Sequence, residues 1–91
     1  MTMPHEIAKE NDDIERANRA EALLANPMIN AALDAIRLKA ESDMRNAKLT
    51  DIPAIQAAKI RHDMVEQFRS ELQQHIRSGA IAADKRKKRM N

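Results

Sequence analysis

The fold is decided by residues 26–46, which read NPMINAALDAIRLKAESDMRN. Asparagine is a preferred residue just before a helix, and proline fits the first helical position because no N–H is needed there. Apolar residues then recur every three or four positions, which is the period of one helix face. They are Ile29, Leu33, Ile36, Ala40 and Met44. We therefore predict a helix over 27–46 that buries one side.

A shorter helix is predicted before this one, over 14–25. Its alanines favour helix, but its large apolar residues are few, so it is weakly anchored. Asp12 or Asp13 is the candidate residue for capping its N–H groups. Proline disfavours helical geometry in the residue before it, so this helix should end by Asn26.

A longer helix is predicted over 52–78, after a connection at 47–51. Thr50 or Asp51 is its candidate cap, and Gly79 is expected to stop it, since glycine commonly follows a helix end. Two apolar stripes run along it and meet at Phe68, and together they are wider than one partner helix covers. We expect the residues of these stripes to contact a partner protein or another subunit. They are Ile60, Met64, Val65, Phe68, Leu72 and Ile76.

The composition predicts an all-α fold with a thin core. The chain has 91 residues, one glycine, one aromatic residue and no cysteine, so one small domain without sheets or disulfides is expected. Apolar residues make up 43% of it, but 16 of them are alanine, which buries little area. The stripes are either ordinary core within one chain or the interface of a homo-oligomer. We expect a helical hairpin of 27–46 and 52–78 that oligomerises, with the first helix packed beside it.

Charge divides the chain into an acidic arm at 1–13, a helical domain at 14–80 and a basic tail at 81–91. Residues 1–83 carry 11 basic and 13 acidic groups, whereas the last eight carry five and one. The five basic residues are consecutive: Lys85, Arg86, Lys87, Lys88 and Arg89. Such a run binds phosphate backbones without reading sequence. The alternatives are an acidic protein surface, its own N-terminal arm included, or a merely solubilising end.

Catalytic chemistry finds no support in the sequence, and we expect no enzyme and no cofactor. The only glycine is Gly79, so no phosphate-cradling loop is available. His62 with Glu66, and Glu71 with His75, stand four residues apart, but each pair offers a metal only two ligands. We therefore expect no metal site. No apolar run is long enough to span a membrane, and the polar N-terminus is unlike a secretory signal, so an intracellular protein is expected.

Two stretches resemble small helical proteins of tailed-phage and prophage morphogenesis clusters. They are RAEALLANPMINAALDAIR at 19–37 and FRSELQQHIRSGAIA at 68–82, and the likeness covers about residues 16–82. Some members of that group resemble small-terminase subunits or other packaging and head-assembly factors. The resemblance implies a non-catalytic oligomer that contacts double-stranded DNA or a phage structural or packaging protein.

The sequence thus suggests a DNA-packaging or head-assembly factor in the bacterial cytoplasm or the virion. The first alternative is a structural or scaffolding protein that docks on capsid, portal or tail without binding nucleic acid. The second is a small inhibitor that folds its amphipathic helices against a host enzyme.

Overall fold

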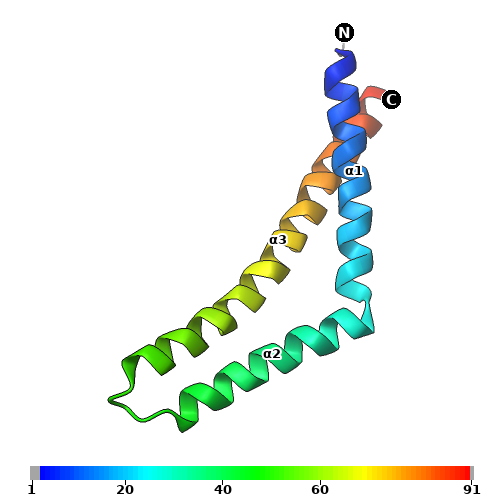
Figure 1. The fold of residues 1–91 in the computed structure, drawn as a ribbon. Coiled ribbons are helices and arrows are strands. Elements are labelled where there is room, and N and C mark those ends of the chain that lie inside the picture. The colour runs from blue at the N-terminus through cyan, green and yellow to red at the C-terminus, as the bar shows by residue number, and fades with distance from the viewer. Residues whose placement is uncertain (1–2, 91) are drawn as a thin grey trace. The chain divides into compact units, whose positions relative to one another are not determined.

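The computed structural model describes residues 3–90 and contains three helices, shown in Figure 1. They are α1 (Pro4–Ala25), α2 (Pro27–Asn46) and α3 (Ile52–Met90). No strand occurs among the described residues. The all-helical prediction is therefore confirmed.

The bounds of α2 and the start of α3 agree with the sequence prediction, because both have strong local signals. The side chain of Asn26 accepts hydrogen bonds from the backbone N–H groups of Met28 at 2.8 Å and Ile29 at 3.3 Å. Asp51 caps α3, since its side chain accepts from the N–H of Ala54 at 3.3 Å. Each cap satisfies N–H groups that have no partner inside the helix.

Helix α1 begins ten residues earlier than predicted. Pro4 is its first residue, and the carbonyl oxygen of Met3 accepts from the N–H of Glu6 at 3.0 Å. Asp12 and Asp13 therefore lie inside the helix and do not cap it. Residues 4–13, expected to form an arm, are helical because proline suits the first position and Glu6 the positive helix end. The first two residues of that expected arm lie outside the described chain.

The prediction that Gly79 ends the third helix is wrong, because α3 continues to Met90. Gly79 has no positive φ, so it is an ordinary helical residue. The alanines and basic residues that follow it are good helix formers, and cations are favourable in a last turn. The expected tail at 81–91 is thus helical as far as Met90, and Asn91 lies outside the described residues.

Contacts divide the chain into two compact units, one of α1 with the end of α3 from Ser70, and one of α2 with α3 up to Arg69. In the first, α1 packs on α3 from Ser70 onward, and the contact is made by small residues. Ala17, Ala20 and Ala82 are buried. A Cβ atom added to Gly79 would lie 2.1 Å from the Cβ of Ala17. The missing side chain of Gly79 therefore lets the two helices approach closely.

In the second unit, α2 packs on the part of α3 that ends at Arg69. Ala40 and Ala58 are fully buried there, and Val65 is 3% exposed. Two ion pairs bridge the helices: Asp43 with Arg61 at 2.9 Å, and Asp34 with Arg69 at 2.8 Å. The earlier residue of α3, Arg61, pairs with the later residue of α2, Asp43, and the reverse holds for Arg69 and Asp34. The two segments therefore run antiparallel.

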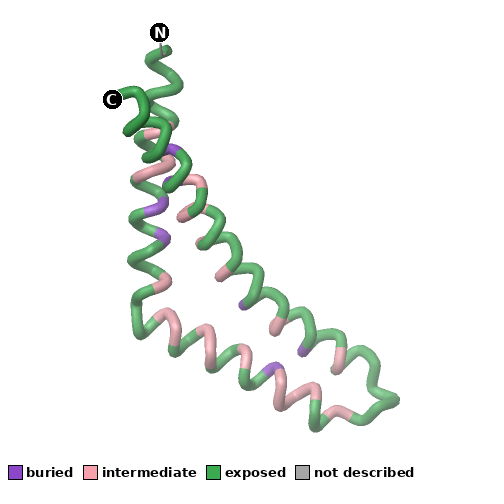
Figure 2. The backbone as a smooth tube through the Cα atoms, turned by 180° about the vertical axis from the view of Figure 1, so that it is seen from behind, coloured by how far each residue is buried: buried purple, intermediate pink, exposed green. Residues whose placement is uncertain are grey.

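The core is built from small side chains, as the composition predicts. The buried apolar residues among 3–90 are five alanines and Val65. Figure 2 shows these few buried positions among long exposed stretches. Small side chains let helix backbones approach closely but remove little area from water. Much of the larger apolar surface consequently remains exposed, including Met28, Ile60 and Met64.

Candidate interaction surfaces

The five consecutive basic residues lie on α3, so helical geometry spreads them around its axis. At 100° per residue, Arg86 and Arg89 lie within about 40° of the buried Ala82, on the side that faces α1. Lys87 and Lys88 lie about 140° and 120° from it. All five cannot contact one phosphate backbone while the helix persists.

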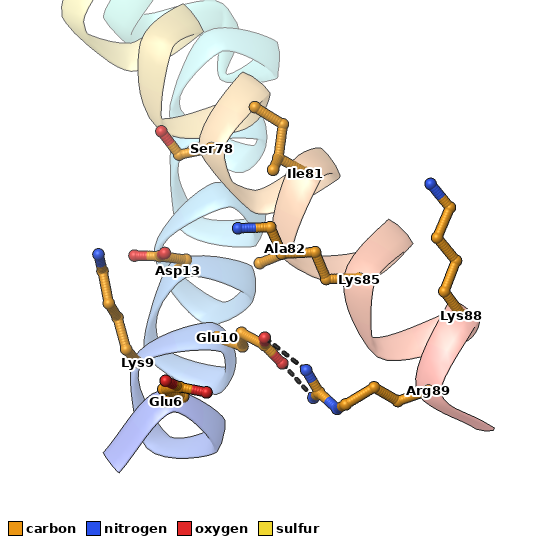
Figure 3. A pocket seen from close by; sticks show the side chains of 10 residues that line it. All are labelled: Glu6, Lys9, Glu10, Asp13, Ser78, Ile81, Ala82, Lys85, Lys88 and Arg89. Carbon is orange, nitrogen blue, oxygen red and sulfur yellow. Dashed lines mark hydrogen bonds and ion pairs between the residues drawn. The ribbon is translucent and has the colours of Figure 1, made fainter. Parts of the chain in front are cut away.

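The two arginines on the inner side contact α1. Arg89 Nη1 donates to Glu10 Oε1 at 2.6 Å, and its Nη2 donates to the other oxygen of the same carboxylate. Arg86 Nη1 donates to the side-chain oxygen of Asn11 at 3.4 Å. Figure 3 shows this fork of bonds at Glu10. One of the alternatives for the basic segment was a contact with the chain's own acidic N-terminal region, and the first unit contains such a contact between Glu10 and Arg89.

The Glu10–Arg89 contact perturbs both groups. Its hydrogen bond from Arg89, together with the nearby charges of Arg89, Lys85 and Arg86, lowers the pKa of Glu10 below its usual range. The same bond raises the pKa of Arg89. Both shifts favour the charged forms, so the pair is ionised at neutral pH.

We expect this contact to persist from neutral pH through the ordinary titration range of glutamate, near pH 4.3, and to be lost only below that range. A carboxyl whose folded pKa is depressed stabilises the folded state above its unfolded pKa, and loses that effect as the pH falls through the folded value. An NMR titration of the Glu10 side-chain carboxyl should give a midpoint below that of Glu10 in a peptide of residues 4–16, which lacks Arg89. Equal midpoints would contradict the contact.

A cleft of about 540 Å³ lies between the N-terminal half of α1 and the end of α3. Its lining has both signs of charge, with carboxylates on α1 facing basic groups on α3, as Figure 3 shows. The charged lining residues are Glu6, Lys9, Glu10, Asp13, Lys85, Lys88 and Arg89. Such a lining fits ion-pair contacts.

The expected partner face of α3 divides into buried and exposed members. Val65 is buried against α2, and Leu72 and Ile76 are half-buried. By contrast, Ile60, Met64 and Phe68 are 59%, 62% and 43% exposed. These three, spaced four residues apart, form a line along one side of the helix, which we call the α3 apolar line.

Ile36 of α2 adds to the apolar surface of the second unit. It is 46% exposed although its spacing places it on the same face of α2 as the buried Ala40. Residues seven apart share a face of a helix, so Ile36 lies on the side of Asp43, and Phe68 on the side of Arg61. Because Asp43 pairs with Arg61, Ile36 and Phe68 flank the same side of the helix contact.

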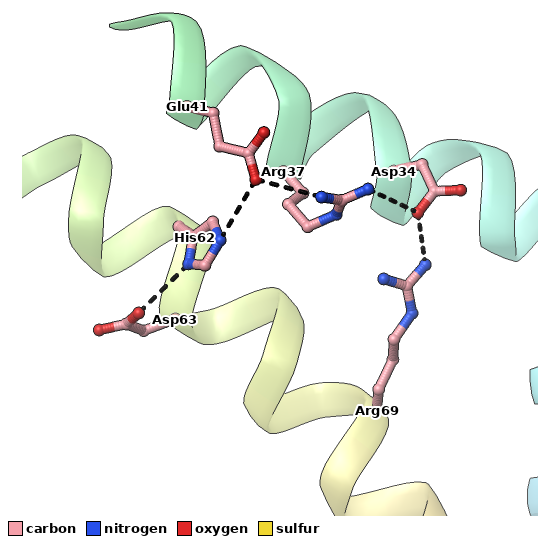
Figure 4. A network of polar contacts seen from close by, with 6 residues as sticks. All are labelled: Asp34, Arg37, Glu41, His62, Asp63 and Arg69. Carbon is pink, nitrogen blue, oxygen red and sulfur yellow. Dashed lines mark hydrogen bonds and ion pairs between the residues drawn. The ribbon is translucent and has the colours of Figure 1, made fainter. Parts of the chain in front are cut away.

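On the other side of the contact between α2 and α3, polar side chains from both helices form a network, shown in Figure 4. Asp34 binds Arg69, and Arg37 binds Glu41 at 3.1 Å. His62 Nε2 lies 3.5 Å from Glu41, and its Nδ1 lies 3.3 Å from Asp63. Hydrogen bonds from Lys59 and then His62 lower the pKa of Asp63. The network ties the two helices in register.

The network also accounts for His62, one of the histidines considered as a metal ligand. It contacts carboxylates on α2 and on its own helix. Among residues 3–90, no three histidine or acidic side chains are grouped so that they could hold a metal ion.

Sequence reasoning missed the interhelical pairs Asp43–Arg61, Asp34–Arg69 and Glu10–Arg89. Their partners are 18, 35 and 79 residues apart, so no local spacing indicates them. The signal that was available is the heptad-like recurrence of small and polar residues on α3, at Ala58, His62, Val65 and Arg69, which marks the seam facing α2.

Comparison of the chain with protein-family models, with curated proteins and with solved structures gave no match. In the part of the chain that the structure describes, no helix is both long and apolar enough to cross a membrane.

Proposed function

We propose that this chain is a non-catalytic, phage DNA-packaging or head-assembly factor of the small-terminase kind. In this proposal, helical hairpins of α2 and α3 associate into a homo-oligomer, in the bacterial cytoplasm or the virion. The oligomer contacts double-stranded DNA through Lys85–Arg89, independently of sequence. The packaging role derives from the resemblance at residues 19–37 and 68–82.

The observation that carries the proposal is the exposed α3 apolar line beside a core of alanines. A helix usually buries its apolar face, and a contiguous exposed apolar surface commonly marks an interaction site. Here Ile60 and Met64 are more than half exposed, while alanines occupy the seam. Association of several copies through this line would remove that surface from water.

The basic segment supplies the proposed DNA contact. Lys87 and Lys88 lie about 140° and 120° around α3 from the buried Ala82, and Lys88, which also lines the cleft, pairs with Asp84 of its own helix at 3.0 Å. Two phosphate contacts per chain give a slope of about −2 for log affinity against log salt. Presenting several copies raises the total affinity without any new contact in one chain.

We expect duplex DNA to be retained at low salt and released as salt rises. Changing both Lys87 and Lys88 to Ala should remove most retention and flatten the salt slope by about 2 per chain, because two phosphate contacts are lost. The matched control changes the exposed Lys39 and Lys48 to Ala, which removes the same charge elsewhere. Filter retention of a labelled duplex across a salt series measures both. Equal losses in the two variants, or no retention at low salt, would contradict the DNA role.

The alternative, a structural or scaffolding protein of the virion, is favoured by one contact. Arg89 already binds a carboxylate, so the basic segment is chemically suited to an acidic protein surface as well. In that case the segment docks the oligomer on capsid, portal or tail. Absence of DNA retention together with an intact oligomer would favour this alternative.

A further inference from the structure

We infer that Glu10 restrains the basic end of α3 and competes with a polyanion for its arginines. The inference rests on the proposed DNA contact and adds its regulation. In this arrangement the acidic side chains in the N-terminal part of α1 cover the basic end of α3, and we call this part of α1 the cover. The basic segment can contact a polyanion with all of its cations only if Arg89 leaves Glu10.

The geometry of the pair supports the restraint. Both terminal nitrogens of Arg89 donate to the two oxygens of one carboxylate, which is the fork arrangement that makes such pairs strong and directional. The Glu10 side chain is 13% exposed and that of Arg89 32% exposed, so neighbouring protein atoms cover a large part of both side chains. Lys85 and Arg86 add to the positive field at Glu10.

The same geometry makes phosphate and Glu10 competitors. The guanidinium of Arg89 binds the Glu10 carboxylate through its two terminal nitrogens, and a phosphate would bind in the same forked manner to the same two nitrogens. A phosphate placed there would also meet the carboxylates of Glu6, Glu10 and Asp13, which line the cleft from α1. Because like charges repel, a polyanion gains Arg89 only by displacing α1 from it.

Four of the five basic side chains fall into two groups, and the fifth, Lys85, lines the cleft. Lys87 and Lys88 lie farthest around α3 from the buried Ala82 and are available first, although Lys88 also reaches the lining of the cleft. Arg86 and Arg89 are held toward α1 by Asn11 and Glu10. Release of the cover would raise the number of phosphate contacts from about two toward four per chain, and the salt slope would steepen accordingly.

The test compares Glu10→Gln with Glu15→Gln. The first removes the carboxylate charge from the cover and keeps the shape of the side chain. The second makes the same charge change on α1 at an exposed residue that pairs with Arg19. Two readouts are used: amide hydrogen exchange of residues 85–90 without DNA, and retention of a labelled 30-base-pair duplex across a salt series.

We expect Glu10→Gln to exchange faster over 85–90, with α2 unchanged as an internal control for folding. We also expect it to bind the duplex about three- to tenfold more tightly than Glu15→Gln, with a steeper salt slope. Unchanged exchange would overturn the restraint. Faster exchange with the same affinity and slope as Glu15→Gln would overturn the competition.

The two readouts also separate this inference from the proposed function. If neither the unmodified chain nor any variant retains DNA, the DNA role and the competition both fail, while the exchange rates still decide the restraint. If the unmodified chain retains DNA and Glu10→Gln behaves as Glu15→Gln, the DNA role stands and the inference fails.

Discussion

Replacing Gly79 by alanine is expected to destabilise the pairing of α1 with α3, although the same change stabilises an ordinary exposed helix. Alanine gains about 1 kcal/mol of helix propensity over glycine. Here, however, its Cβ would lie 2.1 Å from the Cβ of Ala17 and 3.0 Å from the carbonyl oxygen of Asp13. Overpacking of this kind typically costs about 1–3 kcal/mol, so we expect a net loss. Amide exchange of α1 should rise, while that of α2 stays unchanged.

A second substitution tests the cause of that loss. Changing Ala17 to Gly in the Gly79→Ala chain moves the methyl group from one helix to the other and removes the 2.1 Å clash. Protection of α1 should return in large part, limited by the remaining close approach to the Asp13 carbonyl. If Gly79→Ala alone raises the protection of α1, or if the second change has no effect, the close helix crossing is wrong.

Changing Met64 to Glu is expected to dissociate the proposed homo-oligomer and to leave the helical content of each chain intact. Met64 is 62% exposed in the single chain, and exposed substitutions usually change stability by less than about 0.5 kcal/mol. In an assembly that covers the α3 apolar line, the same side chain becomes a buried, unpaired charge. Such a charge typically costs about 3–5 kcal/mol, which weakens association on the order of a hundredfold or more. Sedimentation and circular dichroism together measure mass and helical content.

The matched control is Gln73→Glu, which adds the same charge nine residues further along α3. Nine residues rotate the position by about 180°, so Gln73 lies on the opposite side of the helix from Met64. This exposed residue should tolerate the charge without loss of mass. Association that resists Met64→Glu, or that both variants weaken equally, would show that the α3 apolar line is not the interface.

Local sequence signals were sufficient for α2 and for the start of α3. Asn26-Pro27 combines a side-chain cap with a residue that fits the first helical turn, and the structure uses both. Asp51 serves α3 in the same way. These signals are interactions between residues two or three apart, so they act whatever the rest of the chain does.

The helix ends that the sequence placed incorrectly combine local helix preferences with contacts between distant segments. Gly79 is typical of a helix end when considered alone, yet here its small size serves the close approach of α1. Likewise, α1 and the helical residues 80–90 make contacts with each other, at Ala17, Ala82 and Glu10, that stabilise both segments as helices. No spacing within one helix reveals those partners.

The sequence identified the basic and apolar residues of the candidate surfaces but not their directions. Five consecutive basic residues form one charged block in an extended tail, whereas on a helix they spread around the axis, with Lys85, Arg86 and Arg89 toward α1 and Lys87 and Lys88 farther from it. The apolar stripes likewise separate, with Val65 buried and Ile60 exposed. Which members face a neighbour follows from the helix register set by Asp34–Arg69 and Asp43–Arg61, whose partners are distant in sequence.

The native mass of the full chain, measured by light scattering on a sizing column at several concentrations, tests the central claim most directly. We predict a closed assembly of many copies whose mass is constant on dilution and which Met64→Glu dissociates. A monomer at every concentration would contradict the account, because the exposed Ile60, Met64 and Phe68 would then not join copies of this chain.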